Sequence, residues 1–219
     1  MIRTISFLVS STLACSAQTK VVNLEAVEFK LINTVAEQTT YKGRKSLKVA
    51  ESVNRDPKSS ALAILPLDFH NGVIEVDLAG TIGPGAIPTA RGFVGVAFRV
   101  ATDPLKFECF YLRPTNGRAP DQVRRNHSAQ YISAPDFPWE RLRKQEPEKY
   151  ESYVDLVPGD WTKVKIVVDG VSAKLFVHGH EQPTLLVSDL KKGDSSGAVG
   201  LWIDIGTVAY FSNLRVTKQ

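Results

Sequence analysis

The sequence predicts an all-β fold, a sandwich or barrel of antiparallel strands. Three observations predict this class. Short segments that alternate apolar and polar residues recur along the chain, turns rich in glycine and proline separate them, and no long amphipathic helical pattern interrupts the series. The chain also has no repeat of fixed period, which argues against propellers and solenoids.

Alternation defines the clearest strands and their two faces. In GVIEVDLAG, Ile74, Val76 and Leu78 share one face, while Glu75 and Asp77 share the other. Two further segments repeat the pattern: GFVGVAFRV places Val94, Val96, Phe98 and Val100 opposite Gly95, Ala97 and Arg99, and KFECFYLRP places Phe107, Cys109, Tyr111 and Arg113 opposite Glu108, Phe110 and Leu112.

The last third of the chain continues the series. Its strand-like segments read WTKVKIVVDG, AKLFVHG, GAVGLWIDIG and VAYFSNLRV. Asp169-Gly170 lies between the first two, and this dipeptide is typical of a hairpin turn. Gly179 marks the next turn.

The first residues read as a secretory signal peptide. Arg3 gives a positive start, residues 5–13 are apolar, and small residues precede a predicted cleavage after Ala17. The apolar stretch is too short to span a bilayer. We therefore expect an exported protein, periplasmic or extracellular, with a single domain over residues 18–219. Lipid anchoring at Cys15 is the alternative.

The mature composition excludes several classes of function. Removal of Arg3 lowers the formal net charge from +4 to +3, an excess that does not point to nucleic acid. No later segment reaches transmembrane length. Cys109 remains the only cysteine, so no internal disulfide forms and the core must stabilise the fold. No His, Cys or Asp cluster has metal-ligand spacing, so the sequence indicates no metal and identifies no cofactor.

Residues 114–160 differ from the rest of the chain. They lack the alternation and are rich in proline, arginine, asparagine and aromatic residues. Long connections without regular structure are usually functional or disordered. Aromatic side chains normally pack against something, which argues against disorder. The sequence therefore predicts an ordered insertion, with a short helix within 139–152 that Pro147 interrupts.

The closing segments carry a family resemblance. Trp161 precedes a strand, a hairpin turns at Gly170, GLW follows at 200–202, and the last strand reads FSNLRV. Together they resemble the end of a concanavalin A-like jelly roll of the lectin and glucanase superfamily. More narrowly, they resemble the secreted 3-keto-disaccharide hydrolase and laminin-G-like domains. The resemblance covers roughly residues 25–217.

The resemblance implies a two-sheet antiparallel jelly-roll sandwich in which the concave sheet commonly binds glycans. A fold alone does not establish a function, however. The sequence also departs from well-known members. It lacks the Glu-x-Asp-x-x-Glu strand of retaining glucanases, the metal-binding loops of legume lectins and the signatures of alginate lyases.

A cluster of arginines is the strongest functional signal. Arg113, Arg118, Arg124 and Arg125 stand against one acid, Asp121, so the local net charge of +3 equals that of the whole mature chain. Guanidinium groups bind carboxylate, sulfate or phosphate groups and donate hydrogen bonds to sugar hydroxyls. The alternative is structural: the arginines pair with acidic residues of 136–151 and hold the long loop in place.

Other residues complete the predicted site. His127 and Tyr131 are candidate proton carriers, and Arg125 is a candidate for stabilising developing negative charge. The alternative for this pair is a loop histidine and a tyrosine that anchors the core. Trp139 and Trp202 are candidates for stacking on a sugar ring. The full set of predicted substrate-binding residues is Arg99, Arg113, Asn116, Arg118, Asn126, Trp139, Trp202 and Asp204.

The sequence therefore predicts a secreted, carbohydrate-active protein. As the resemblance implies, it binds and cleaves a glycan as a hydrolase or lyase in polysaccharide degradation, and the arginines favour an acidic glycan. Two alternatives stay open: a non-catalytic carbohydrate-binding module that uses the same residues, and an adhesion domain with a protein partner. The sequence does not define the sugar or the oligomeric state.

Overall fold

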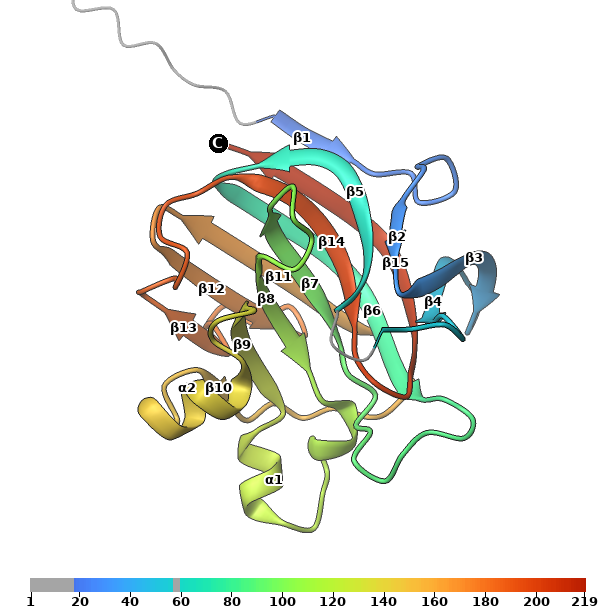
Figure 1. Ribbon diagram of the computed structural model, residues 1–219. Helices are drawn as coiled ribbons and strands as arrows, with labels where there is room; N and C mark the ends of the chain where they lie inside the picture. The colour runs from blue at the N-terminus through green and yellow to red at the C-terminus, as the bar shows by residue number, and fades with distance from the viewer. Residues whose placement is uncertain (1–17, 57–59) are drawn as a thin grey trace, which may run out of the picture.

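The computed structural model describes residues 18–56 and 60–219 (Figure 1). The predicted signal peptide at 1–17 and the alternative anchor Cys15 lie outside the described residues. Among the described helices, none combines the length and apolar character needed to cross a membrane.

The described residues form two antiparallel sheets. Sheet A runs in the order β13 (Leu185–Val187), β12 (Ser172–Val177), β11 (Thr162–Asp169), β6 (Gly72–Ile82), β15 (Thr207–Lys218), β4 (Arg44–Glu51) and β3 (Thr34–Tyr41), and β1 (Gln18–Val21) pairs with β15. Sheet B runs in the order β10 (Glu151–Ser152), β9 (Ala129–Ala134), β8 (Phe107–Leu112), β7 (Val94–Val100), β14 (Gly197–Ile203), β5 (Ala61–Phe69) and β2 (Lys30–Ile32).

The main core lies between the sheets, as the alternation predicts. Ile74, Val76 and Leu78 of β6 pack there with Val94 and Phe98 of β7, and all are almost fully buried. The predicted hairpin also forms: Asp169 pairs with Ser172, and Gly170 takes a φ of 52° at the turn.

A second hydrophobic cluster lies on the opposite, outer face of sheet B. Its buried members are Leu62, Ile64, Ala97, Val100, Phe107, Cys109, Tyr111 and Trp202. These residues alternate along their strands with core residues, so they face away from sheet A. This face is therefore apolar over much of its area, and we refer to it below as the outer face of sheet B.

The predicted position of Val100 is wrong. We expected it beside Val94 and Phe98, but it joins the outer cluster. The cause is an irregularity at the end of β7: Arg99 has a φ of 52°, and the pairing of β14 with β7 shifts register between Ala198 and Gly200. An extra residue at such a bulge reverses the faces of the residues that follow.

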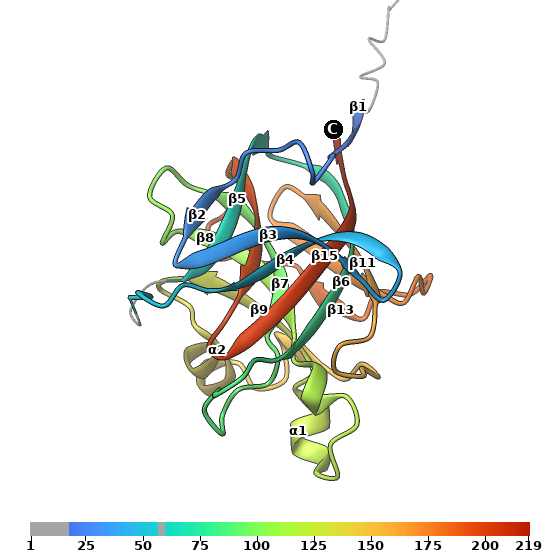
Figure 2. The ribbon, with the colours of Figure 1, turned by 90° about the vertical axis from the view of Figure 1, so that its right-hand side faces the viewer.

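Residues 114–160 are ordered, and they contain more regular structure than we expected. They include the short helices η1 (Pro114–Asn116), α1 (Gln122–Asn126) and α2 (Trp139–Gln145), together with β9 and β10. Strand β9 pairs with β8 over its whole length, so this segment completes the edge of sheet B. Figures 1 and 2 show α1 and α2 at the same end of the sandwich.

Candidate functional site

Two neighbouring pockets lie where the outer face of sheet B meets α1 and α2. The first, which we call the arginine pocket, has a volume of about 400 Å³, and its polar lining includes Arg91, Arg113, Asn116, Arg124, His127 and Arg143. The second, the tryptophan pocket, has a volume of about 320 Å³ and is lined by Arg55, Ile132 and Trp202 among others. Both pockets include Tyr111, Trp139 and Asp204, so we treat them as one groove.

Aromatic rings form the floor of the groove. Tyr111 of β8 and Trp202 of β14 approach to 4.6 Å between ring centroids, although β7 runs between their strands. Gly95 of β7 is the residue paired with both of them. A Cβ atom at this position would lie 2.5 Å from the Tyr111 Cβ, so only glycine lets the two rings meet across the strand. Trp139 stands at the rim with 37% of its surface exposed.

Arg113 is buried at the end of β8, on the face that the alternation predicts. Its guanidinium donates hydrogen bonds to the Tyr111 hydroxyl at 2.7 Å, to Gln130 Oε1 at 3.1 Å and to the His127 carbonyl at 2.9 Å. It also lies 4.9 Å from the centre of the Tyr111 ring and 5.7 Å from that of Trp139. The arginine is therefore fixed in one orientation, with aromatic rings on both sides.

Two further arginines reach the same pocket from other elements. Arg91 comes from the connection between β6 and β7 and donates to the Pro88 and Ala90 carbonyls, both at 2.7 Å. Arg124 comes from α1, and its side chain donates to Asn116 Oδ1 at 3.4 Å. Burial, followed by the like charges of Arg124 and Arg113, lowers the pKa of Arg91.

A histidine and a carboxylate lie beside these arginines. Glu151 of β10 accepts from Arg143 at 2.8 and 3.0 Å, and its Oε2 lies 3.0 Å from His127 Nδ1. The Glu151 side chain is 4% exposed and that of His127 is 18% exposed. Burial lowers the pKa of His127 and outweighs the opposing charge of Glu151, so the imidazole is neutral near pH 7. The arrangement is a histidine oriented by a buried acid.

No protein-family model matches the chain, and no curated protein matches it. Solved structures do match. The carbohydrate binding module CBM66 from Bacillus subtilis aligns with a TM-score of 0.55 at 14% identity, over 86% of this chain and 94% of that chain. A putative glycosyl hydrolase from Parabacteroides distasonis ATCC 8503 aligns with a TM-score of 0.52 at 15% identity, over 87% and 88%. A Bacillus subtilis protein of unknown function with a galectin-like fold gives 0.50 at 13%, over 88% and 89%.

The fold is a concanavalin A-like jelly roll. This confirms the predicted fold class and, as a likeness of fold alone, the broader resemblance. The narrower likeness to 3-keto-disaccharide hydrolases stays a prediction.

The jelly roll brings together only part of the predicted site. Arg113, Asn116, His127, Trp139 and Asp204 line the arginine pocket, and Trp202 lines the tryptophan pocket. Asn116 is held by its own hydrogen bond to the His127 carbonyl at 3.2 Å. Asp204 accepts from Arg55 at 2.8 Å, so its charge is already paired.

The other predicted arginines lie outside both pockets. Arg118 is 65% exposed and forms a two-bond ion pair with Asp155 at 2.8 Å. Arg125 donates to the Tyr153 hydroxyl at 2.8 Å and stacks on that ring. Asn126 accepts from Gln122 and faces a separate small pocket that it shares with His127. Arg118 therefore pairs with an acidic residue, but Asp155 lies beyond the acidic residues of 136–151 that the structural alternative named.

Tyr131 and Arg99 are buried away from the groove. Tyr131 lies in the main core, where its hydroxyl donates to Glu108 Oε2 at 2.6 Å and accepts from the Lys191 amide at 2.9 Å. The Arg99 side chain is 0% exposed and joins three loops through the carbonyls of His70, Gly170 and Gly193. The geometry therefore separates the two residues: Tyr131 faces the main core from within β9, whereas His127 precedes β9 at the end of α1 and lines the arginine pocket.

Several groove residues were not among the predicted ones, and Tyr111, Arg143 and Arg91 are the most prominent of these. Tyr111 had a signal, since its strand alternates with Arg113 on the same face. Arg143 had a weaker signal as a basic residue in the expected short helix. Arg91 had none, because it lies more than twenty positions before the cluster in a loop of unremarkable composition.

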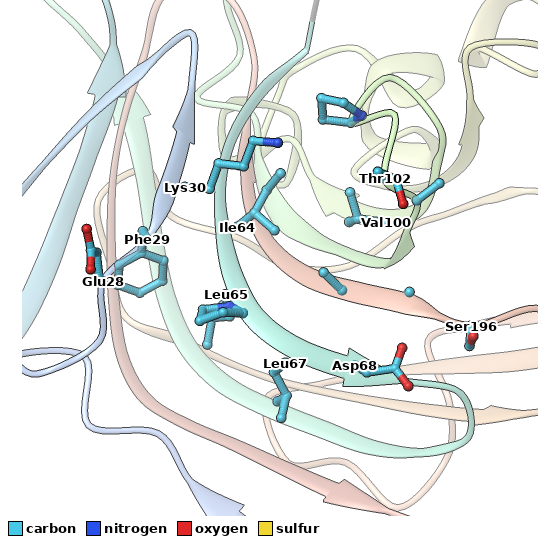
Figure 3. Close-up of a pocket in the computed structure, with 15 residues that line it drawn as sticks. Glu28, Phe29, Lys30, Ile64, Leu65, Leu67, Asp68, Val100, Thr102 and Ser196 are labelled. Carbon is cyan, nitrogen blue, oxygen red and sulfur yellow. The ribbon is translucent and has the colours of Figure 1, made fainter.

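A further, wider pocket lies farther along the same outer face, between β2, β5 and β14 (Figure 3). Its volume is about 840 Å³, and Ile64, Val100 and Ala198 form part of its apolar lining. Its charged residues have both signs, Lys30 against Glu28 and Asp68. Within residues 18–56 and 60–219, no group of His, Cys, Asp and Glu is arranged to hold a metal ion.

Proposed function

We propose that the groove binds a saccharide. The observation that carries this proposal is the pairing of exposed aromatic surface at Trp139 with the hydrogen-bond donors of Arg91 and Arg124 in one concave site. A sugar ring has an apolar face of C–H groups and a rim of hydroxyls, so it needs both kinds of contact at once. The solved structures of the same fold, a carbohydrate binding module among them, support the same class of ligand.

The proposal includes export and an acidic ligand. Arg3 and the apolar residues 5–13 support a secretory route to the periplasm or the cell exterior. The excess of arginine over acidic residues around the groove supports an acidic saccharide over a neutral one.

A glycan array with neutral, uronic and sulfated members tests the proposal. We expect retention of one saccharide class, and we expect Trp139→Ala to weaken it by about tenfold or more, the effect of losing a well-placed aromatic contact. Tyr153→Ala is the matched control, because Tyr153 is an exposed aromatic residue of the same segment that lines neither pocket of the groove. Retention that is equal in Trp139→Ala and wild type would refute the site. Absence of any retained glycan, with a protein captured instead, would favour the adhesion alternative.

Cleavage of the bound saccharide is a second candidate function, and the His127–Glu151 pair favours it. Glu151 occupies Nδ1, which leaves Nε2 as the ring nitrogen able to take a proton from a bound molecule or return one. The neighbouring Arg113 would stabilise negative charge that develops on the substrate. Tyr131 and Arg125 have no part in this version, since their side chains lie outside the groove.

Product analysis separates the two functions. If the protein is an enzyme, incubation with the retained glycan should release new reducing ends or unsaturated products, and His127→Ala should abolish release while binding and folding persist. If the glycan is recovered intact, the protein acts as a binding module.

A further inference from the structure

Three guanidinium groups converge on the arginine pocket without a carboxylate to neutralise them. Among the described residues, the acceptors of Arg91, Arg113 and Arg124 are carbonyls, an amide oxygen or a hydroxyl, all neutral. The fourth arginine, Arg143, is paired with Glu151. The one acid that lines the pocket, Asp204, is paired with Arg55.

The like charges of this arrangement repel one another. Arg113 is only 5% exposed, and a buried charge needs an opposite charge or excellent hydrogen bonding to be tolerated. The like charges of Arg113 and Arg124 also act on Arg91 and oppose its protonation. An anion placed among the three groups would remove this repulsion and accept from the remaining N–H groups of Arg91 and Arg124, which donate through only one terminal nitrogen each. Arg113 would act mainly through its charge, because both of its terminal nitrogens already donate twice within the protein.

The neighbouring tryptophan pocket has no such excess. Its arginine, Arg55, contacts both Glu51 and Asp204, and Glu140 also lines it. The positive field is therefore confined to one half of the groove, while Trp202 and Trp139 dominate the other half. The two halves fit different parts of one ligand.

We propose that the arginine pocket binds an anionic substituent of the saccharide, a carboxylate, sulfate or phosphate group, with Arg91, Arg113 and Arg124 as its ligands. The adjoining sugar unit lies over Trp139 toward the tryptophan pocket. This inference rests on the proposed saccharide-binding function and narrows it to chains that carry a charged group on one unit. It also replaces Arg118 and Arg125 of the sequence-based cluster with Arg91.

Calorimetric titration with matched pairs of oligosaccharides tests the inference. The pairs are oligogalacturonides against their methyl esters, sulfated galactan oligosaccharides against the desulfated form, and a phosphorylated against an unphosphorylated sugar. Inorganic sulfate and phosphate are titrated alone. The test variants are Arg91→Gln and Arg124→Gln, whose side chains are less buried than that of Arg113 and carry fewer contacts. Arg118→Gln is the matched control, because it removes the same charge from the same segment outside the pocket.

We expect the charged member of one pair to bind at least about tenfold more tightly than its neutral partner, with the advantage reduced at high salt. Each test variant should weaken binding of the charged member by about tenfold and leave the neutral member unchanged. Arg118→Gln should behave as wild type. The pair that shows the effect identifies the anionic group.

The titrations distinguish failure of the anion inference from failure of the proposed function. If neutral and charged members bind equally and the variants change neither, the anion inference is wrong while saccharide binding stands. If inorganic sulfate or phosphate binds and no saccharide adds affinity, the proposed function is wrong while the anion site stands. If nothing binds to a protein that melts cooperatively, both are wrong.

Discussion

Arg99 offers a direct test of whether a residue stabilises the fold or binds the ligand. The sequence places it among substrate-binding residues, whereas the structure buries it at the bulge that ends β7. Its guanidinium donates to the carbonyls of His70 at 3.0 Å, Gly193 at 2.8 Å and Gly170 at 2.8 Å. It also donates to Asn71 Oδ1 at 2.9 Å. We therefore expect Arg99→Met to destabilise the fold and to leave ligand binding unchanged.

The magnitude follows from the bonds that are lost. A hydrogen bond to a charged group contributes about 1.5–3 kcal/mol, and a buried acceptor left unpaired costs about 1–3 kcal/mol. These values do not add in full, because methionine avoids the cost of burying a charge. We expect a loss of about 3–5 kcal/mol in the free energy of unfolding. For a domain of this size that corresponds to a fall in Tm of about 10 °C.

Thermal and urea denaturation followed by circular dichroism measure this effect. Arg118→Met is the control, since an exposed ion pair contributes little to stability and the Tm of this variant should hardly change. An Arg99→Met variant that melts like wild type but no longer binds the saccharide would refute the structural role and support the predicted role of Arg99 in binding.

Two further predictions concern the residues first considered for proton transfer. Tyr131→Phe removes the hydroxyl that bridges Glu108 and the Lys191 amide, so it should lower the free energy of unfolding by about 1–3 kcal/mol. Saccharide binding and any cleavage should stay intact. Loss of activity at unchanged stability would contradict this prediction. His127 should titrate below its ordinary pKa of 6.5, mainly because of burial. Because the unfolded chain then binds the proton more readily, the stability that His127 contributes is complete above pH 6.5 and is lost as the pH falls toward the folded value. Between a pH above 6.5 and one below it, the free energy of unfolding should fall less in His127→Gln than in wild type. An NMR titration that places the pKa of His127 above 6.5 would contradict this prediction.

The alternation of the sequence was enough to predict the fold class and most of the core. Period two identified the apolar inward face of β6 correctly and divided β8 into its two faces, because side chains alternate along a strand. It failed at Arg99, where one residue in a left-handed conformation reverses the order of faces. Such a bulge depends on tertiary contacts, here the three carbonyls that hold the guanidinium, and leaves no local signal.

The candidate site was harder to predict, because the residues that line a pocket are decided by where their side chains point in the folded protein and not by their spacing in the chain. Arg118 and Arg125 lie within the arginine-rich run but turn toward Asp155 and Tyr153. Arg91 lies outside that run and faces the pocket. The strand β9 was missed because its sequence, AQYISA, is short and sits among polar residues. Without β9, the burial of Tyr131 in the main core cannot be inferred.

Strands β9 and β10 form the edge of sheet B and also support one wall of the groove. Gln130 of β9 accepts from Arg113, and Glu151 of β10 holds both Arg143 and His127. The outermost strands therefore cannot fray without dismantling the wall of the groove. A molecule bound in the groove therefore lowers the population of the state in which this edge is open. Binding should slow amide hydrogen exchange in β9 and β10, while the exchange rates of the far strands of sheet A stay unchanged.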